Sequence, residues 1–173
     1  MRTAARPDDG WRLEDADDAV VDTLIEWLPD EHSVNTWGGP KFRYPFTRET
    51  FLEDCRWGEI ASLALRDAEG RLAGFGQVYE RHGRINLARL IAHPERRGQG
   101  IGKRLVDLLM RHGAALLPAA EFSLYVYRDN LPAYYCYKSL GFEIDTYPDG
   151  DPLADVCHYM TRPVADYRGG GSQ

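Results

Sequence analysis

Cysteine is scarce in this chain of 173 residues. Its three cysteines, Cys55, Cys136 and Cys157, are odd in number, widely separated and without the spacing of metal ligands. This argues against a disulfide framework and a structural zinc site, and we expect no bound metal. Long hydrophobic runs are missing too: no stretch reaches about 18 apolar residues, and residues 1–10 lack the apolar core of a signal peptide. We therefore expect no membrane span, no secretion and a cytoplasmic protein.

Positive charge is also in short supply. Lysine and arginine total 21 against 27 aspartates and glutamates, which leaves a formal net charge of −6. Contacts with phosphate backbones need a surplus of basic side chains on one face, so we expect no nucleic-acid partner. An acidic surface concentrates cations instead, which favours a cationic or amine-bearing partner.

Length and patterning predict one domain, over residues 11–163. A chain of this mass buries about 70% of its unfolded surface, which is enough for one good core. The polar beginning and the glycine-rich end, residues 1–10 and 168–173, are expected to be flexible tails.

The order of predicted elements is that of an α/β protein. Apolar spacing predicts helices over 18–28, from Thr47 onward, over 101–116 and over 130–140, and an aromatic-rich loop over 30–46. Strands are expected over 60–66, 71–80, 84–92, 122–127, 142–147 and 156–160, the first three being consecutive and antiparallel. The sequence therefore predicts a mixed, mostly antiparallel central sheet flanked by about four helices.

The most informative segment is the glycine-rich stretch between the third of these strands and the long helix. Gly98, Gly100 and Gly102 lie where that helix begins, and glycines there leave backbone N–H groups open to a ligand. Unpaired N–H groups and the helix dipole favour an anion. Between Glu95 and Arg104 there are four basic side chains and one acid, a local charge of +3. A flexible, solvated turn is the alternative that such a cluster alone leaves open.

Two familiar phosphate-binding loops do not fit these residues. A Walker loop needs glycine at position 97 and serine or threonine at 104, where the chain has arginines. A dinucleotide-binding fingerprint that starts at Gly98 needs glycine at 103, where the chain has Lys103. The motif that fits is Arg-x-x-Gly-x-Gly over residues 97–102.

With this motif the chain resembles the GCN5-related N-acetyltransferase (GNAT) family. A second match lies downstream, in Asn130, Ala133, Tyr137 and the pair Gly141-Phe142. The resemblance covers about residues 60–160. It implies a GNAT-like domain with splayed strands around an acetyl-CoA site, and direct acetyl transfer to a primary amine of a small-molecule or peptide acceptor. A CoA-binding sensor or interaction module without turnover is the alternative.

The resemblance also assigns the residues that bind the cofactor. In that family the glycine loop holds the CoA pyrophosphate, and the preceding strand pairs with pantetheine and the thioester through its backbone. The CoA-binding residues that it implies in this chain are Leu90, Ile91, Ala92, Arg97, Gly98, Gln99, Gly100, Ile101, Gly102, Lys103 and Asn130.

Tyr137 is the predicted general acid. Asn130, Tyr134 and Tyr137 recur at helical spacing on one side, and Asn130 is expected to cap the helix. A tyrosine there can donate a proton to the departing CoA thiolate. Cys136 is a poor candidate for a nucleophile, because no histidine is near it in sequence and we expect it to point away from the face of Tyr137.

The general base is harder to assign. An amine with the ordinary lysine pKa of about 10.4 must lose a proton before it can attack. In the histone-acetylating branch of the family a glutamate on the strand before the loop takes that proton, and the matching residue here is Asn86. This departure puts direct base catalysis there in doubt. Glu80 is a candidate base acting through a water, although it also fits a solvated residue at a hairpin end.

The acceptor pocket is expected around Trp37, Phe42, Tyr44 and Asn86. The aromatic loop occupies the stretch that lines this pocket in the family, while simple burial of the rings explains it as well. A polyamine-like metabolite, an amino acid, an antibiotic and a protein N-terminus are all candidate acceptors.

Overall fold

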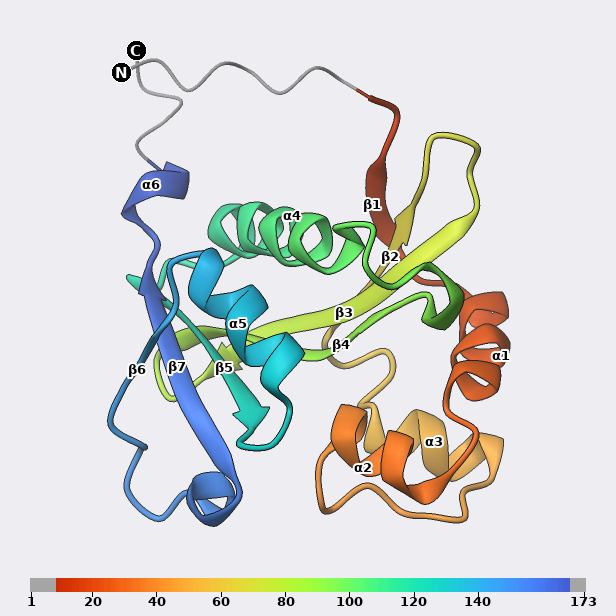
Figure 1. The fold of residues 1–173 in the computed structure, drawn as a ribbon, viewed down its shortest axis with the longest axis horizontal. Coiled ribbons are helices and arrows are strands. Elements are labelled where there is room, and N and C mark those ends of the chain that lie inside the picture. Colours follow the sequence, from red (N-terminus) through yellow and green to blue (C-terminus); the bar gives the residue numbers. More distant parts are fainter. Residues whose placement is uncertain (1–8, 169–173) are drawn as a thin grey trace.

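A seven-stranded sheet in the order β1-β2-β3-β4-β5-β7-β6 organises the chain (Figure 1). The computed structural model describes residues 9–168. Only β4 and β5 pair in parallel, and the other neighbouring strands are antiparallel. The predicted mixed, mostly antiparallel sheet is confirmed. Its strands are β1 (Arg12–Asp15), β2 (Ala61–Arg66), β3 (Leu72–Arg81), β4 (Arg84–Ala92), β5 (Glu121–Tyr127), β6 (Glu143–Ile144) and β7 (Cys157–Pro163).

Six α-helices accompany the sheet in the part of the chain that the structure describes, against the four or so predicted. The additional ones are α2 and the short α6. The helices are α1 (Asp18–Trp27), α2 (Glu31–Gly38), α3 (Arg48–Asp54), α4 (Ile101–Leu116), α5 (Leu131–Ser139) and α6 (Ala165–Arg168), and 3₁₀ turns cover Pro94–Arg96 and Pro152–Asp155.

The helix α2 corrects the prediction of a loop over 30–46. Its start is fixed by a capping box, in which the Asp30 carboxylate accepts from the Ser33 N–H at 2.8 Å and the Ser33 hydroxyl accepts from the Asp30 N–H at 3.2 Å. Val34 and Trp37, one turn apart, are buried. The glycine–glycine–proline sequence that follows ends this helix rather than preventing it.

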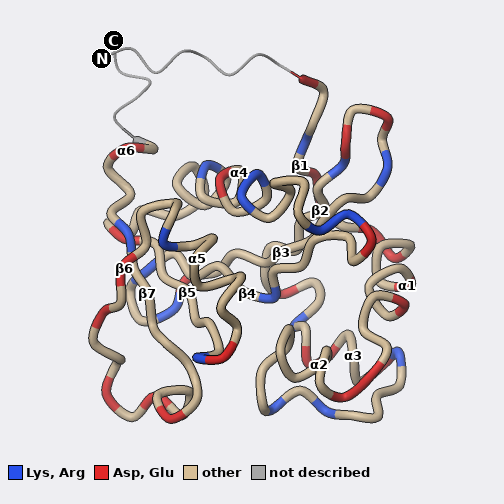
Figure 2. Tube along the Cα trace, viewed as in Figure 1, with Lys and Arg blue, Asp and Glu red and all other residues tan. Residues whose placement is uncertain are grey.

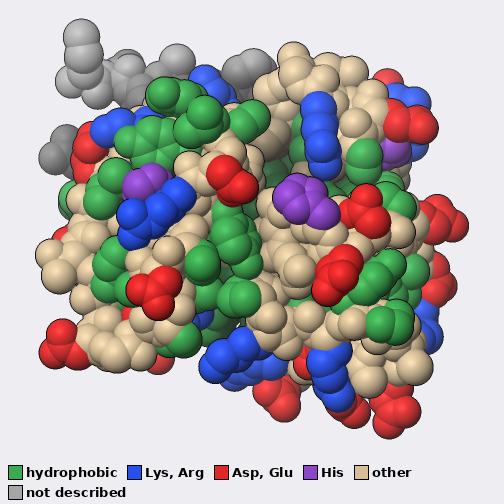
Figure 3. Space-filling view, turned by 60° about the horizontal axis from the view of Figure 1, so that its bottom comes forward, with side chains coloured by type: hydrophobic (Ala, Val, Ile, Leu, Met, Phe, Trp, Pro, Cys, Tyr) green, Lys and Arg blue, Asp and Glu red, His purple; other side chains and the backbone are tan. Residues whose placement is uncertain are grey.

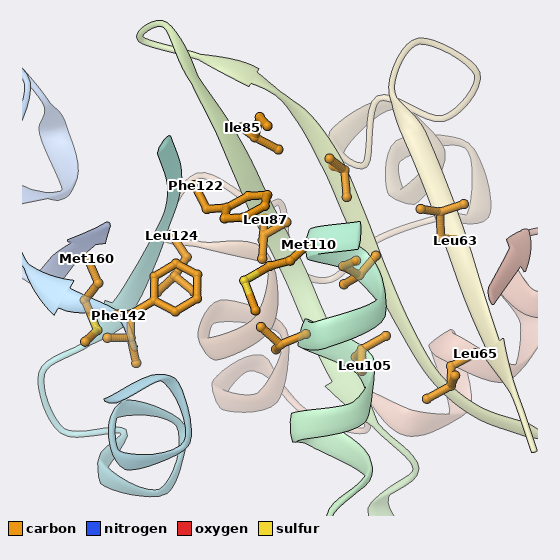
Figure 4. Close-up of a cluster of buried hydrophobic side chains, with 14 of the residues drawn as sticks. Leu63, Leu65, Ile85, Leu87, Leu105, Met110, Phe122, Leu124, Phe142 and Met160 are labelled. Atoms are coloured by element: carbon orange, nitrogen blue, oxygen red, sulfur yellow. The ribbon is translucent and has the colours of Figure 1, made fainter. Parts of the chain in front are cut away.

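The main hydrophobic core lies between α4 and the sheet (Figure 4). Two glycines let the helix approach closely. A Cβ on Gly113 would lie 2.7 Å from Ile85 Cγ2, and one on Gly76 would lie 2.5 Å from Leu109 Cδ1. Larger residues at either place would push α4 away from the strands, and with it the loop at its N-terminus.

A second cluster covers the opposite face of the sheet beneath α1, α2 and α3. Phe51 is fully buried, with its ring stacked on Trp37 at 5.6 Å between centroids and edge-on to Phe42 at 5.4 Å. Phe75 of β3 closes the cluster from the sheet side. The aromatic residues expected in a loop therefore form a packed core that seats α2 against the sheet.

Strand β6 and the N-terminal segment differ in extent from the predicted strand and tail. Strand β6 is only two residues long, where 142–147 was predicted, because it is an exposed outer strand and the chain turns away from it toward Pro148. At the N-terminal end Asp9 is already anchored, since its carboxylate accepts from Arg104 at 2.5 Å. Apart from Asp9, Gly10 and Arg168, the expected tails lie outside the described residues.

Candidate active site

The glycine loop, residues 97–103, leads from β4 into α4 and presents open backbone. Gly98 and Gly100 have φ values of +83° and +76°, which favour glycine, and a Cβ on either would meet nothing within 4 Å. Gly100 is the N-cap of α4 and provides no side-chain cap. The first N–H groups of a helix lack partners within the helix, so this end of α4 is suited to an anion.

The basic side chains of the segment 96–104 are not equivalent. Arg104 is already compensated, by Asp9 and by the Trp11 ring that lies 4.5 Å from its guanidinium. Arg97 and Lys103 have no ion pair within the described residues, and both line the cavity next to the loop. Figure 2 shows the basic run between β4 and α4, close to the β2–β3 hairpin. Two cations therefore remain available at the helix N-terminus.

The Arg96 guanidinium donates a hydrogen bond to the buried carboxylate of Asp67, at 2.9 Å. Burial alone would raise the pKa of Asp67, but hydrogen bonds from the Arg71 N–H, Arg96 and the Glu69 N–H lower it to about 2. Asp67 is therefore ionised at neutral pH and fixes the base of the loop to the β2–β3 hairpin.

Strands β4 and β5 pair only at their beginnings, through Ile85–Phe122 and Asn86–Ser123. Beyond these pairs the two strands diverge, which confirms the predicted splay. A bulge adds to it: Phe75 pairs with Ile91 and Gln77 with Ala88, so β4 has one more residue than β3 across this interval. The unpaired part of β4 borders a cavity of about 760 Å³, a size typical of small-molecule sites.

The cavity gathers most of the residues that sequence analysis proposed. Figure 3 shows a hollow with hydrophobic side chains between two lobes of the molecule. The predicted residues that line the cavity are Trp37, Asn86, Leu90, Ile91, Ala92, Arg97, Gly98, Gly100, Ile101, Gly102, Lys103, Asn130 and Tyr137. Gln99, Glu80, Phe42 and Tyr44 are not among its lining residues.

Tyr137 lies on α5 and faces the cavity. Burial raises the pKa of its hydroxyl, and the nearby Cys136 adds to the effect, so the proton stays on the oxygen at physiological pH. Within residues 9–168 that hydroxyl has no hydrogen-bond partner. Asn130 does occupy the N-cap of α5, but its side chain makes no capping hydrogen bond.

Cys136 also lines the cavity, contrary to the expectation that it points away from Tyr137. Neighbouring helix positions are about 100° apart, and the cavity reaches far enough around α5 to include both. Burial raises the pKa of the Cys136 thiol, which keeps it protonated and a poor nucleophile.

The structure does not bring Glu80 to the cavity. Its neighbours on β3, Tyr79 and Arg81, line the cavity, and strand alternation points Glu80 to the other side. There its carboxylate accepts from the Gly83 N–H of the hairpin turn at 2.8 Å. Asn86 is buried and accepts from the Ser123 hydroxyl at 3.1 Å. Among the described lining residues there is no aspartate or glutamate that could act as a base.

Sequence reasoning missed two strand arginines, Arg81 and Arg89, that line the cavity. Alternation along β3 could have placed Arg81 beside the predicted site. Nothing local in the sequence marks Arg89, whose φ of 50° belongs to the bulge of β4.

An elongated cavity next to an anion-binding helix end suits a ligand with a phosphate group at one end. The acetyltransferase (GNAT) family model matches residues 20–142, and the chain therefore belongs to this family. Mycothiol acetyltransferases of Clavibacter sepedonicus and Clavibacter michiganensis subsp. michiganensis are 38% and 37% identical to the chain over 91 residues. That match covers 50% of this chain but only 28% of each relative.

Solved structures share the fold across nearly the whole chain. Spermidine N-acetyltransferase from Vibrio cholerae, in complex with CoA and spermine, superposes with a TM-score of 0.70 at 16% identity, covering 91% of this chain and 98% of that one. A dodecameric structure of a spermidine N-acetyltransferase from the same organism gives a TM-score of 0.64 at 16% identity, with 94% and 99% covered.

Within residues 9–168 no helix has both the length and the apolar character needed to cross a membrane. Over the same residues no three or more histidine, cysteine, aspartate or glutamate side chains gather as metal ligands would.

Proposed function

We propose that this chain transfers the acetyl group of acetyl-CoA directly to the nitrogen of a primary amine. The observation that carries the proposal is the gap between β4 and β5, which ends at the open N-terminus of α4. Pantetheine needs polar backbone along its length and the pyrophosphate needs N–H donors at its end. The unpaired part of β4 supplies the first, and the glycine loop supplies the second.

The residue roles follow from that placement. Backbone groups of Leu90–Ala92 bind pantetheine and orient the thioester, and residues 97–103 bind the pyrophosphate, with Arg97 and Lys103 adding charge. The amine nitrogen attacks the thioester carbonyl carbon, an N–C bond forms and the C–S bond breaks. Tyr137 gives its proton to the departing sulfur, and the amine proton leaves to water because the described lining residues include no carboxylate.

Substitution of Gly102 tests the position of the pyrophosphate. A Cβ here would have its nearest neighbour, Cys136 Sγ, at an ordinary contact distance of 3.9 Å, so the protein tolerates a side chain. Gly102→Asp puts a carboxylate among the N–H donors, and repulsion should weaken CoA binding about a hundredfold in calorimetry. Gly102→Ala is the matched control and should bind CoA nearly as the parent does. Equal affinity of parent and Gly102→Asp would contradict the site.

Thiol release from acetyl-CoA across a panel of amines tests turnover itself. Acetyl transfer releases CoA thiol in an amine-dependent way and adds one acetyl mass to the amine, whereas hydrolysis of acetyl-CoA releases thiol without that product. A CoA-binding module of the same fold would bind CoA in the calorimetry above and release no thiol with any amine.

A further inference from the structure

Every charged side chain among the described residues lining the cavity is basic. These side chains are Arg81, Arg89, Arg96, Arg97 and Lys103, and no aspartate or glutamate accompanies them. Arg96 is paired with Asp67, but Arg89, Arg97 and Lys103 have no ion pair among the described residues, so the charged lining has the opposite sign to the net charge of the chain, −6. An amine acceptor that enters the cavity meets a positive field rather than a negative one.

The five basic side chains form two groups. Arg96, Arg97 and Lys103 lie around the N-terminus of α4, where we place the CoA phosphates. Arg81 and Arg89, the strand arginines, come from β3 and β4. They lie on the face of the sheet turned away from α4: Arg89 donates to Gln77 at 2.8 Å, and Gln77 in turn reaches the Cys55 carbonyl at the end of α3. The strand arginines therefore do not belong to the group at the N-terminus of α4.

Arg89 is held in place but is not neutralised. Gln77 donates to the Cys55 carbonyl at 2.7 Å and to the Ser62 hydroxyl at 2.9 Å, which turns its own carbonyl toward Arg89. The Arg89 Nε is buried and has no hydrogen-bond partner within the described residues. No carboxylate there lies within 4 Å of the guanidinium, and the nearby Asp54 is occupied by Arg43. Asp54 interacts with Arg89 only at longer range, so this partly buried cation has no carboxylate in direct contact among the described residues, and a bound anion would supply one.

Arg81 also lines the cavity. Its guanidinium lies 4.7 Å from the centre of the Tyr125 ring, which orients it. The nearest carboxylate is Asp151 at 3.9 Å, and that carboxylate is already engaged by the Tyr125 hydroxyl and by the Leu153 N–H. Donors of Arg81 thus remain for a ligand.

A polyamine is a poor match for this lining. The similar Vibrio cholerae structure contains spermine, whose several amines are cationic at neutral pH. Cationic groups taken out of water need carboxylates or other acceptors around them, and the lining offers two more cations instead. An acceptor with an anionic group beside its amine would gain the contacts that a polyamine loses.

We infer that the acceptor carries a carboxylate as well as its amine, as an amino acid or a short peptide does, and that Arg89 and Arg81 bind this carboxylate. The inference rests on the acetyl transfer proposed above and names its substrate class. Arginine suits the role because its planar guanidinium can donate two parallel hydrogen bonds to a carboxylate. Neutral amides and polyamines lack that partner.

Paired acceptors test the inference directly. The probes are the standard amino acids, their dipeptides with glycine, the C-terminal amides of both sets and spermidine, with kcat/KM expressed per unprotonated amine. The best carboxylate-bearing acceptor should exceed its own amide about tenfold or more, as expected for hydrogen bonds to a charged group. Whether the free amino acid or the dipeptide is better identifies the natural source of the carboxylate.

The variants Arg89→Gln and Arg81→Gln should reduce that preference, the ratio of kcat/KM for the acid to kcat/KM for its amide, about tenfold. If Arg89→Gln proves unstable, Arg89→Lys is the variant to use. It retains the charge but not the bidentate guanidinium, and it should keep part of the preference. Arg12→Gln, on β1 outside the cavity, is the matched control.

Amides or spermidine acetylated as fast as the acids would overturn the inference and leave acetyl transfer intact. No thiol release with any amine would overturn the proposed function, and the inference with it.

Discussion

Two glycine-containing regions of this protein use glycine for opposite purposes. In the glycine loop, a Cβ on Gly98 or Gly100 would meet nothing within 4 Å. At the end of α2, a Cβ on Gly38 would lie 2.5 Å from the ring of Phe42. The first region leaves backbone open to a ligand, whereas the second uses the missing side chain to pack an aromatic ring. The spacing of glycines in the sequence does not distinguish the two regions, but the free space around each glycine in the structure distinguishes them.

The same contrast extends to the side chains nearby. Around the loop, Arg97, Lys103 and the Tyr137 hydroxyl have no partner within the described residues, as expected for groups that await a ligand. Around α2, the rings of Trp37 and Phe51 stack on each other and the Trp37 Nε1 donates to the Arg89 carbonyl at 2.8 Å. Changes on the open side should therefore alter activity, and changes on the packed side should alter stability.

The largest effect is expected on the open side, at Tyr137. Tyr137→Phe removes the proton donor that we propose for the departing thiolate, and general acid catalysis is typically worth about a hundredfold or more in rate. Single-turnover measurements should show this loss in the chemical step, with CoA affinity and melting temperature close to those of the parent, because the hydroxyl has no partner to leave unpaired. A parent-like rate would place the proton donor elsewhere.

The pKa of Tyr137 sets the pH behaviour of this comparison. Burial raises it above the ordinary value of about 10, so the hydroxyl keeps its proton throughout the range in which the protein is assayed. The rate of the parent should therefore not fall through deprotonation of Tyr137 as the pH rises to 9. A fall that the parent shows and Tyr137→Phe lacks would contradict this.

An intermediate effect is expected on the packed side, at Gly38. In Gly38→Ala the new methyl group meets Phe42, whose ring is fixed by Trp37, Phe46 and Phe51. Overpacking costs about 1–3 kcal/mol, which exceeds the gain of up to about 1 kcal/mol from a better helix former. Urea unfolding should show reduced stability, while calorimetry shows unchanged CoA affinity. Gly102→Ala is the matched substitution in open space, and equal destabilisation by the two would remove the distinction between the regions.

The sequence predicts those parts of the site whose signal is local. The glycine loop and its basic residues form a short motif before α4, and Tyr137 belongs to the second motif, in α5, that resembles the family, so both could be located from the sequence. Helix α2 was missed because its capping box and the pair Val34 and Trp37 precede a glycine–glycine–proline sequence that is typical of loops. Secondary-structure signals of this kind compete, and tertiary packing of the aromatic rings decides between them.

Arg89 and Glu80 show where sequence reasoning ends. Which face of a strand a side chain occupies depends on register, and the bulge in β4 changes that register at Arg89. Glu80 was proposed as a base from its position at a strand end. Because side chains alternate along a strand, Glu80 points to the face opposite its neighbours Tyr79 and Arg81, away from the cavity. Net charge likewise describes the whole surface and does not give the sign of the cavity.

The smallest effect is expected behind the loop, at Asp67, where a packed charge network supports the open region. Asp67→Asn replaces one carboxylate oxygen with an amide nitrogen, which cannot accept from Arg96 or Arg71. The melting temperature at pH 7 should fall by a few degrees. Glu69→Gln, an exposed carboxylate on the same turn, is the matched control and should change it little.

Acid titration then tests whether the carboxylate charge is responsible. The pKa of Asp67 is lowered to about 2, below the ordinary value of about 3.9 that it has in the unfolded chain. A group of this kind stabilises the fold fully above pH of about 4, and that stabilisation is lost as the pH falls through about 2. The difference in melting temperature between the parent and Asp67→Asn should therefore be constant from pH 7 to about 5 and shrink below that. A difference that persists unchanged at pH of about 2 would mean that Asp67 acts through its shape and not through its charge.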